Sequence, residues 1–235
     1  MQRYLRVLRR RAYALLWGGA TVSSVGDGMS FVALVWLVLE RGGGAAEVGW
    51  LGAAFSAPVV IGGLVGGIFL DRFEPRKVLI VDNAIRGLVM ASIPVAAAFD
   101  ALTMAHLFVA AGAYGLLYMV SGAGLPTILP RLLAGEELVT ANAMESITWN
   151  LGGVGGPVLA GLLIAVLGAP AVVVFDALSY GVFVACLLAM GPLPPLRRAA
   201  TVASRGLWPA VRFILATPAV LAITLLYMKI GRAHV

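Results

Sequence analysis

Six long apolar stretches, separated by short segments that hold most of the charged residues, constrain this sequence more than any other feature. A membrane-spanning helix needs about 20 mostly apolar residues, and each stretch reaches that length. Of the 235 residues, 61% are hydrophobic and 12% are charged, about half the charged share of a soluble domain, which excludes a soluble globular fold. We therefore expect an all-α membrane protein with spans at 12–39, 48–70, 78–99, 104–124, 142–167 and 170–190.

Lysine and arginine are unevenly distributed among the segments that connect these spans. Thirteen lie in the N-terminal tail and in every second connection, whereas the alternate connections hold only Arg41. Cytoplasmic segments of membrane proteins carry the excess of basic residues. We therefore expect a multi-pass protein of the inner (plasma) membrane with a cytoplasmic N terminus. The net charge of +6 then reflects topology, and we expect no nucleic-acid partner.

Composition divides the chain into five segments. Residues 1–11 form a basic cytoplasmic tail, and 12–190 form the six-helix transmembrane domain. Residues 191–218, which contain prolines and arginines, are predicted to be a cytoplasmic linker. Residues 219–228 are predicted to begin a seventh helix that is too short to cross a bilayer. Residues 229–235 are the translation of the opening of a widely used sequencing-library adapter, so we interpret them as a non-native tail on an N-terminal fragment.

The sequence contains no constellation that indicates an enzyme. The single cysteine, Cys186, allows no disulfide framework or cysteine metal site. The patterns GxxxxGK[ST], HExxH and GxSxG are absent from the sequence. His106, at the start of the fourth span, is interpreted as an interfacial residue. We expect no catalytic activity, metal or cofactor.

Five ionisable side chains lie inside the predicted spans, where burial of charge is costly and a functional role is the default hypothesis. Asp27, near the middle of the first span, is the proton-coupling candidate, and its alternative role is a polar contact between helices. Asp82 and Arg86 lie four residues apart on one helix face, so they are predicted to neutralise each other. Glu145, near an inner helix end, and Asp176, near an outer end, are secondary candidates with a gate-edge or structural role.

The connection between the second and third spans contains Gly67, Asp71, Arg72, Arg76 and Lys77. A glycine here would let two helices approach closely, the acid would accept a hydrogen bond at the membrane edge, and the basic pair would anchor the loop in the cytoplasm. These residues also fit an ordinary cytoplasmic turn. Together with the six spans they resemble the loop signature GxxxDRxGRR/K of the major facilitator superfamily, with one extra residue in place of the second glycine. The resemblance implies a loop that acts in conformational switching.

The fifth predicted span contains Gly152, Gly156, Pro157 and Gly161. Small residues at this spacing favour close helix packing, and the proline frees a backbone carbonyl, so the helix can bend. The pattern resembles the antiporter motif GxxxGPxxGG of the superfamily's exporters. A tight helix crossing without an antiport role is the alternative.

The second and fifth spans are both interrupted by glycine and proline, at corresponding places in two sets of three helices. This arrangement predicts a bundle of inverted 3+3 repeats. Further segments are similar to the bacterial efflux and secretion-effector branch of the superfamily: Ser24, Gly26, Asp27; Asn142, Ala143; and Phe175, Asp176, Ala177, Leu178, Ser179.

The resemblance implies a twelve-helix secondary transporter that exports a small molecule, such as a drug or a siderophore, by proton antiport. This chain would then be its N-terminal half, and the missing C-terminal half would be its main partner within the bilayer. A non-transporting membrane scaffold, or a membrane subunit that works with a separate partner, is the alternative.

Overall fold

The computed structural model describes residues 2–195 and 216–217. Residues 196–215 and 218 of the predicted linker 191–218 lie outside the described residues. The predicted seventh helix 219–228 and the predicted non-native tail 229–235 lie wholly outside them.

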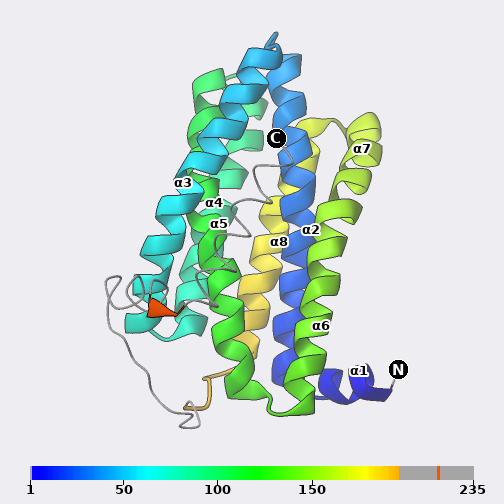
Figure 1. Cartoon of the computed structure of the whole chain (residues 1–235). Helices are drawn as coiled ribbons and strands as arrows, with labels where there is room; N and C mark the ends of the chain where they lie inside the picture. Colours follow the sequence, from blue (N-terminus) through cyan, green and yellow to red (C-terminus); the bar gives the residue numbers. More distant parts are fainter. Residues whose placement is uncertain (1, 196–215, 218–235) are drawn as a thin grey trace. The chain divides into compact units, whose positions relative to one another are not determined.

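The described part of the chain is an all-α bundle with six helices long and apolar enough to cross a membrane. The predicted fold class is therefore confirmed. In Figure 1, α2 and α8 lie at the centre, with α3, α4 and α5 on one side and α6 and α7 on the other. The spans are α2 Arg11–Glu40, α3 Ala45–Arg72, α4 Pro75–Ala98, α5 Met104–Leu132, the continuous run of α6 Glu136–Asn150, η1 Leu151–Gly155 and α7 Gly156–Leu167, and α8 Ala169–Ala189.

A short helix, α1 (Gln2–Leu8), precedes the first span and lies across the end of the bundle (Figure 1). Val7 is buried against the bundle, whereas Tyr4 and Leu5 are exposed. Arg10, just after α1, forms an ion pair with Glu137 at the start of α6, with 2.8 Å between Nη2 and Oε2. The basic tail is thus attached to the start of the fifth span.

The fourth span is longer than its sequence predicts. The span predicted at 104–124 corresponds to α5, which continues to Leu132 with Pro126 and Pro130 inside it. Each proline removes one backbone hydrogen bond, and the last turns are held instead by Ile128 and Leu129, which are buried in the core. The predicted boundary of this span is therefore wrong by about two turns.

The packing of the helices repeats between the two halves of the bundle. The helix α2 packs on α8 and on the α6–α7 span, α5 packs on α3 and α4, and α4 packs on α8. If α2 is exchanged with α5, α3 with α6–α7, and α4 with α8, the same set of neighbours results. Since each half has three spans, equivalent helices run in opposite directions, as inverted repeats require.

The two equivalent helix crossings are both closed by glycine. A Cβ on Gly28 of α2 would collide with the carbonyl of Gly152. In the other half, a Cβ on Gly115 of α5 would collide with the carbonyl of Phe55 in α3. Backbones of the α2/η1 and α3/α5 pairs therefore approach more closely than any side chain would permit.

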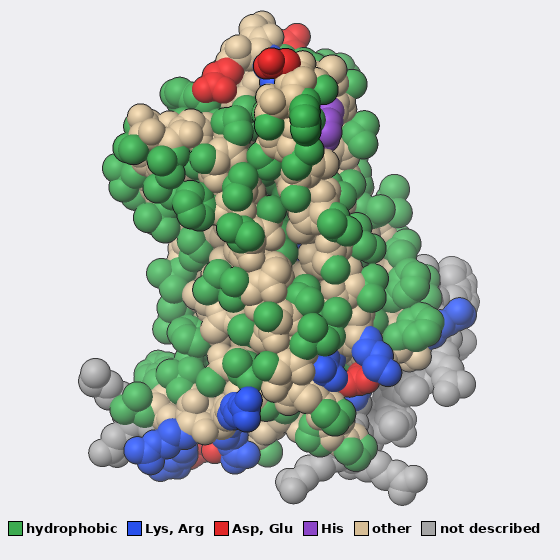
Figure 2. Space-filling view, turned by 180° about the vertical axis from the view of Figure 1, so that it is seen from behind, with side chains coloured by type: hydrophobic (Ala, Val, Ile, Leu, Met, Phe, Trp, Pro, Cys, Tyr) green, Lys and Arg blue, Asp and Glu red, His purple; other side chains and the backbone are tan. Residues whose placement is uncertain are grey.

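The outer surface is mainly hydrophobic between two ends of different charge. Figure 2 shows lysine and arginine gathered at one end, with acidic side chains and a histidine at the other. The first end contains the arginines of residues 3–11 and of the α3–α4 connection, and the second contains Glu40, Glu47 and Asp100 with Arg41. The connections that are rich in lysine and arginine thus lie at one end of the bundle, and the alternate connections lie at the other.

Candidate functional site

The centre of the bundle holds a guanidinium shared by two carboxylates. Arg86, near the midpoint of α4, lies 3.3 Å from Asp82 Oδ2 on the same helix and 3.3 Å from Asp27 Oδ1 on α2. Among the described residues Arg86 is the single buried lysine or arginine. The predicted pair Asp82–Arg86 and the predicted coupling residue Asp27 thus belong to one network rather than to two separate sites.

Hydroxyl groups from two further helices and an amide group from α4 complete this network. Arg86 Nη2 donates to Ser121 Oγ of α5 at 2.7 Å, and Ser121 Oγ donates to Asp82 Oδ2 at 2.8 Å. Arg86 also donates to Asn83 Oδ1 at 3.1 Å. The Tyr180 hydroxyl of α8 donates to Asp27 Oδ1, and its ring centroid lies 4.7 Å from the Arg86 guanidinium. Burial of the charges is therefore offset by close partners on four helices.

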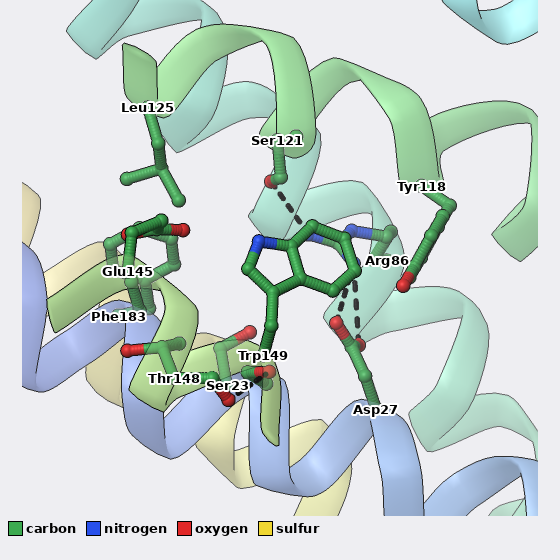
Figure 3. A pocket seen from close by; sticks show the side chains of 13 residues that line it. Ser23, Asp27, Arg86, Tyr118, Ser121, Leu125, Glu145, Thr148, Trp149 and Phe183 are labelled. Atoms are coloured by element: carbon green, nitrogen blue, oxygen red, sulfur yellow. Dashed lines mark hydrogen bonds and ion pairs between the residues drawn. The ribbon is translucent and has the colours of Figure 1, made fainter. Parts of the chain in front are cut away.

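Asp27 is the charged member of this network with the most exposed side chain. Its side chain is 18% exposed, compared with 1% for Arg86 and 2% for Asp82. Two adjoining cavities, of about 50 and 340 Å³, share Asp27, Ser24, Tyr118 and Trp149 in their walls, and together we call them the central hollow. Figure 3 shows Asp27 and Ser121 converging on Arg86, with Trp149 and Tyr118 beside them.

The larger cavity is lined by aromatic rings from four segments. Tyr118 of α5 contacts Phe55 of α3 and Trp149 of α6, with ring centroids 5.7 and 6.2 Å apart. Phe55 also contacts Tyr114 at 5.4 Å and Phe31 of α2 at 6.1 Å. The smaller cavity is more polar, since hydroxyl side chains and the carboxyl of Glu145 line it with Asp27 and Arg86. Glu145 thus lines the hollow.

Asp176 does not lie at an accessible helix end. It is the eighth residue of α8 and is fully buried, where it accepts hydrogen bonds from Ser30 and Ser179. A Cβ on Gly26 would collide with the Asp176 carboxyl, so the absent side chain of that glycine makes room for the acid. The sequence places Asp176 near the outer end of its span, but it is buried because the start of α8 is itself packed inside the bundle.

The α3–α4 loop fits its predicted roles only in part. Asp71 and Arg72 are exposed, and Arg76 donates to the Leu187 and Leu188 carbonyls at 2.6 and 3.1 Å, so it caps the C-terminal end of α8. Close helix approach at Gly67 is not found within the described bundle, because no atom lies within 4 Å of a Cβ built there. The adjacent Gly66 packs on Val120 instead. Lys77 pairs with Glu74 within the loop at 3.5 Å.

The predicted antiporter-like helix contains an irregular turn at the hollow. Residues Leu151–Gly155 form a π-helical segment that Gly156 separates from Pro157, which cannot donate a backbone hydrogen bond. Gly152 and Gly156 pack against Gly28, whereas a Cβ on Gly161 would meet no atom within 4 Å. Gly152, Gly153 and Pro157 also line the larger cavity. The irregular turn therefore lies where the crossing and the hollow meet.

Sequence reasoning missed Ser121 and Tyr180, which the equivalence of the two halves of the bundle relates to Asp27 and Arg86. The residues Asp27, Asp82 and Arg86 precede Ser121, Asp176 and Tyr180 by 94 residues each. Asp82 and Arg86 are residues 8 and 12 of α4, and Asp176 and Tyr180 are residues 8 and 12 of α8. The Asp27–Tyr180 hydrogen bond is thus the equivalent of the Ser121–Arg86 bond. The polar residues of the network therefore occupy equivalent positions in the two halves of the bundle.

Comparisons with known proteins agree with this architecture. The sequence profile of the family described as transmembrane secretion effector matches residues 4–223. The chain is 31% identical over 189 residues to the multidrug efflux pump Tap of Mycobacterium tuberculosis, covering 77% of this chain and 44% of that protein. It is 31% identical over 165 residues to Tap of Mycolicibacterium fortuitum, covering 68% of this chain and 40% of that protein.

A further relative is the enterobactin exporter EntS of Shigella dysenteriae. The identity is 28% over 173 residues, covering 71% of this chain and 40% of that protein. The chain therefore spans less than half the length of these curated relatives, all of which are transporters. Since the family profile matches most of its residues and six apolar helices form its bundle, the chain belongs to the transmembrane secretion effector family of the major facilitator superfamily, a family of efflux transporters.

Proposed function

We propose that this chain is the N-terminal half of a proton-coupled exporter of small molecules in the bacterial plasma membrane. The observation that carries the proposal is the position of Asp27, the one acid that belongs to the buried ion network and also lines the central hollow. Tap is named a multidrug efflux pump and EntS an enterobactin exporter. Both names describe export of small molecules, which supports the same class of cargo here.

The network allows Asp27 to change its charge without leaving a buried cation unpaired. If the Asp27 carboxylate takes up a proton, Arg86 still contacts Asp82 at 3.3 Å and Ser121 at 2.7 Å. An uncompensated buried guanidinium would be costly, so this second carboxylate keeps both states of Asp27 accessible. A proton bound from the hollow on one side of the membrane is then released when the hollow opens to the other.

Movement in this proposal comes from the two halves of a complete transporter rocking about the hollow. The chain spans less than half of its relatives, which supports a second six-helix half that closes the site. The exposed Asp71 and Arg72 are free to contact that half, while Arg76 couples the loop to the end of α8. The π-helical turn before Pro157 gives the fifth span a place to bend.

Genomic sequence and transport assays test this proposal. We expect the genomic reading frame to continue past codon 228 through a second set of spans, and a stop codon there would contradict the half-transporter. In everted vesicles that contain the complete protein, Asp27→Asn should abolish proton-coupled export while membrane insertion is retained. Asp71→Asn should slow export without loss of substrate binding. Export and proton movement at the wild-type rate in Asp27→Asn would assign coupling to another acid, with Glu145 tested next.

Orientation is a separate part of the proposal and has its own test. The basic end of the bundle is assigned to the cytoplasm by the excess of lysine and arginine. In a Cys186→Ala background, cysteines replace Ala46 and Ala134, which are exposed at opposite ends. An impermeant maleimide added to intact cells should label the first and spare the second. Labelling of the second alone would reverse the orientation.

A further inference from the structure

The geometry points to an organic cation with an aromatic or aliphatic body as the class of molecule that the central hollow binds. This inference rests on the proposed function, because it names the substrate class of the same site. It depends on three observations: the rings that line the larger cavity, the acids that face the hollow, and the burial of the nearest cation.

The first observation is the continuous aromatic wall of the larger cavity. Phe31, Phe55, Tyr114, Tyr118 and Trp149 come from α2, α3, α5 and α6, and each ring contacts at least one other in this set. Aromatic faces attract cations through the ring quadrupole and offer apolar area to the body of a ligand. Trp149 is 48% exposed, so its ring is available to a molecule in the hollow.

The second observation is the charge that the hollow presents. Asp27 lines both cavities and Glu145 lines the smaller one, and among the described residues no lysine or histidine lines either. Arg86 lines the smaller cavity, but its side chain is 1% exposed and lies between two carboxylates. Three acids, Asp27, Asp82 and Glu145, thus accompany one guanidinium, and the network and hollow together carry an excess of negative charge when the carboxyls are ionised.

The third observation is how the two cavities join. Asp27, Tyr118 and Trp149 lie in the walls of both, so a carboxylate and two aromatic rings surround the junction. A ligand that places its charge at this junction extends its apolar body into the larger cavity of about 340 Å³. A cation there competes with Arg86 for Asp27, and Asp82 retains the displaced guanidinium. An anion of the same shape would meet the acids with no exposed cation to compensate.

Two ions of matched shape and opposite charge test this inference directly. The 235-residue chain in nanodiscs of neutral lipid is dialysed to equilibrium against tetraphenylphosphonium or tetraphenylborate, with empty nanodiscs as the blank. We expect saturable binding of the cation above the blank and none of the anion. Equal binding of both ions, or no saturable binding of the cation, would overturn the inference.

Variants then locate the binding site. Asp27→Asn should weaken tetraphenylphosphonium binding about tenfold, the effect of losing one close charge partner. The control Asp100→Asn neutralises an exposed acid away from the hollow, at a residue with φ of 53° that asparagine tolerates, and should bind as the unmodified chain does. An unchanged affinity of Asp27→Asn for tetraphenylphosphonium would contradict the proposal that the ligand's positive charge binds beside Asp27.

A second pair of variants keeps the test independent of folding effects in the ion network. Tyr118→Leu should weaken binding about fivefold, whereas Tyr118→Phe retains the ring and should restore most of that loss. Phe99→Leu removes an exposed ring outside the hollow and is the matched control. Binding is measured without transport, so the two proposals can fail separately. If the chain binds the cation but the complete protein shows no proton-coupled export, the proposed function alone is refuted. Coupled export without cation preference would refute this inference alone.

Discussion

The two three-helix halves of the bundle share a backbone arrangement but differ in chemistry at equivalent positions. The first half places Asp27, Asp82 and Arg86 at the centre of the bundle, and the second places Ser121, Asp176 and Tyr180 there. The first set contains the buried cation, and the second replaces it with a phenol that stacks on it.

This difference indicates that the repeat determines where polar groups meet, whereas the side chains at those positions determine what the site can do. Two arginines at the equivalent positions would face each other across the α4–α8 contact and would repel. Tyrosine at one of them gives a hydrogen bond to Asp27 and a ring for Arg86. The departure from symmetry therefore creates a single ion network with one exposed acid.

The largest effect is expected from the position where the halves differ most. Arg86→Met leaves two carboxylates without a cation and should lower the free energy of unfolding by about 3–5 kcal/mol. At the equivalent position Tyr180→Phe removes one hydroxyl bond and should cost about 1 kcal/mol. Titration of the chain with SDS in mixed micelles measures both values. Equal losses would mean that the charge contributes no more than the hydroxyl.

The same comparison applies to the two acids. Asp82→Asn removes a buried ion pair and should cost about 2 kcal/mol, whereas Asp176→Asn, whose partners are hydroxyl groups, should change stability by about 1 kcal/mol or less. A double-mutant cycle of each with Arg86→Met should give about twice the coupling energy for Asp82. Equal coupling would show that Arg86 stabilises both acids.

Sequence reasoning predicts the parts of this site that depend on local spacing. The i, i+4 pair Asp82–Arg86 follows from one helix, and the depth of Asp27 follows from the length of one apolar stretch. The convergence of Asp27 on Arg86 depends on how α2, α4 and α8 cross, and no pattern within a single span contains that information.

The errors have related physical causes. Helix α5 passes two prolines because tertiary packing compensates for the lost backbone bonds. Asp176 is buried because Gly26 on another helix leaves room for it. Gly67 was expected at a helix contact, but its neighbour Gly66 occupies that contact. In each case the sequence predicts the helix itself but not the residues of the neighbouring helix that pack against it.

The glycines offer a smaller test of the repeat. Gly28 and Gly122 are equivalent by the 94-residue spacing, yet a Cβ on Gly28 collides with the Gly152 carbonyl and one on Gly122 meets open space. Gly28→Ala should therefore destabilise the bundle by about 1–3 kcal/mol, and Gly122→Ala should leave it unchanged or slightly more stable. A tolerated Gly28→Ala would argue against close packing at the first crossing.

The smallest effect is expected at the equivalent residues Gly87 of α4, which faces α8, and Gly181 of α8, which does not face another helix of the described bundle. A Cβ on Gly87 would lie 3.3 Å from Tyr180 Cβ, so Gly87→Ala should gain nothing, because the tight contact offsets the helix-favouring methyl group. A Cβ on Gly181 meets no atom within 4 Å, so Gly181→Ala should raise the free energy of unfolding by about 0.5–1 kcal/mol, the conformational cost that glycine carries in a helix. SDS titration of the Gly87→Ala and Gly181→Ala variants, with Gly122→Ala measured alongside them, distinguishes the two expected effects. An equal gain at both positions would mean that α4 and α8 separate enough at Gly87 to admit a methyl group, and the stacking of Arg86 on Tyr180 would then need to be looser than the structure has it.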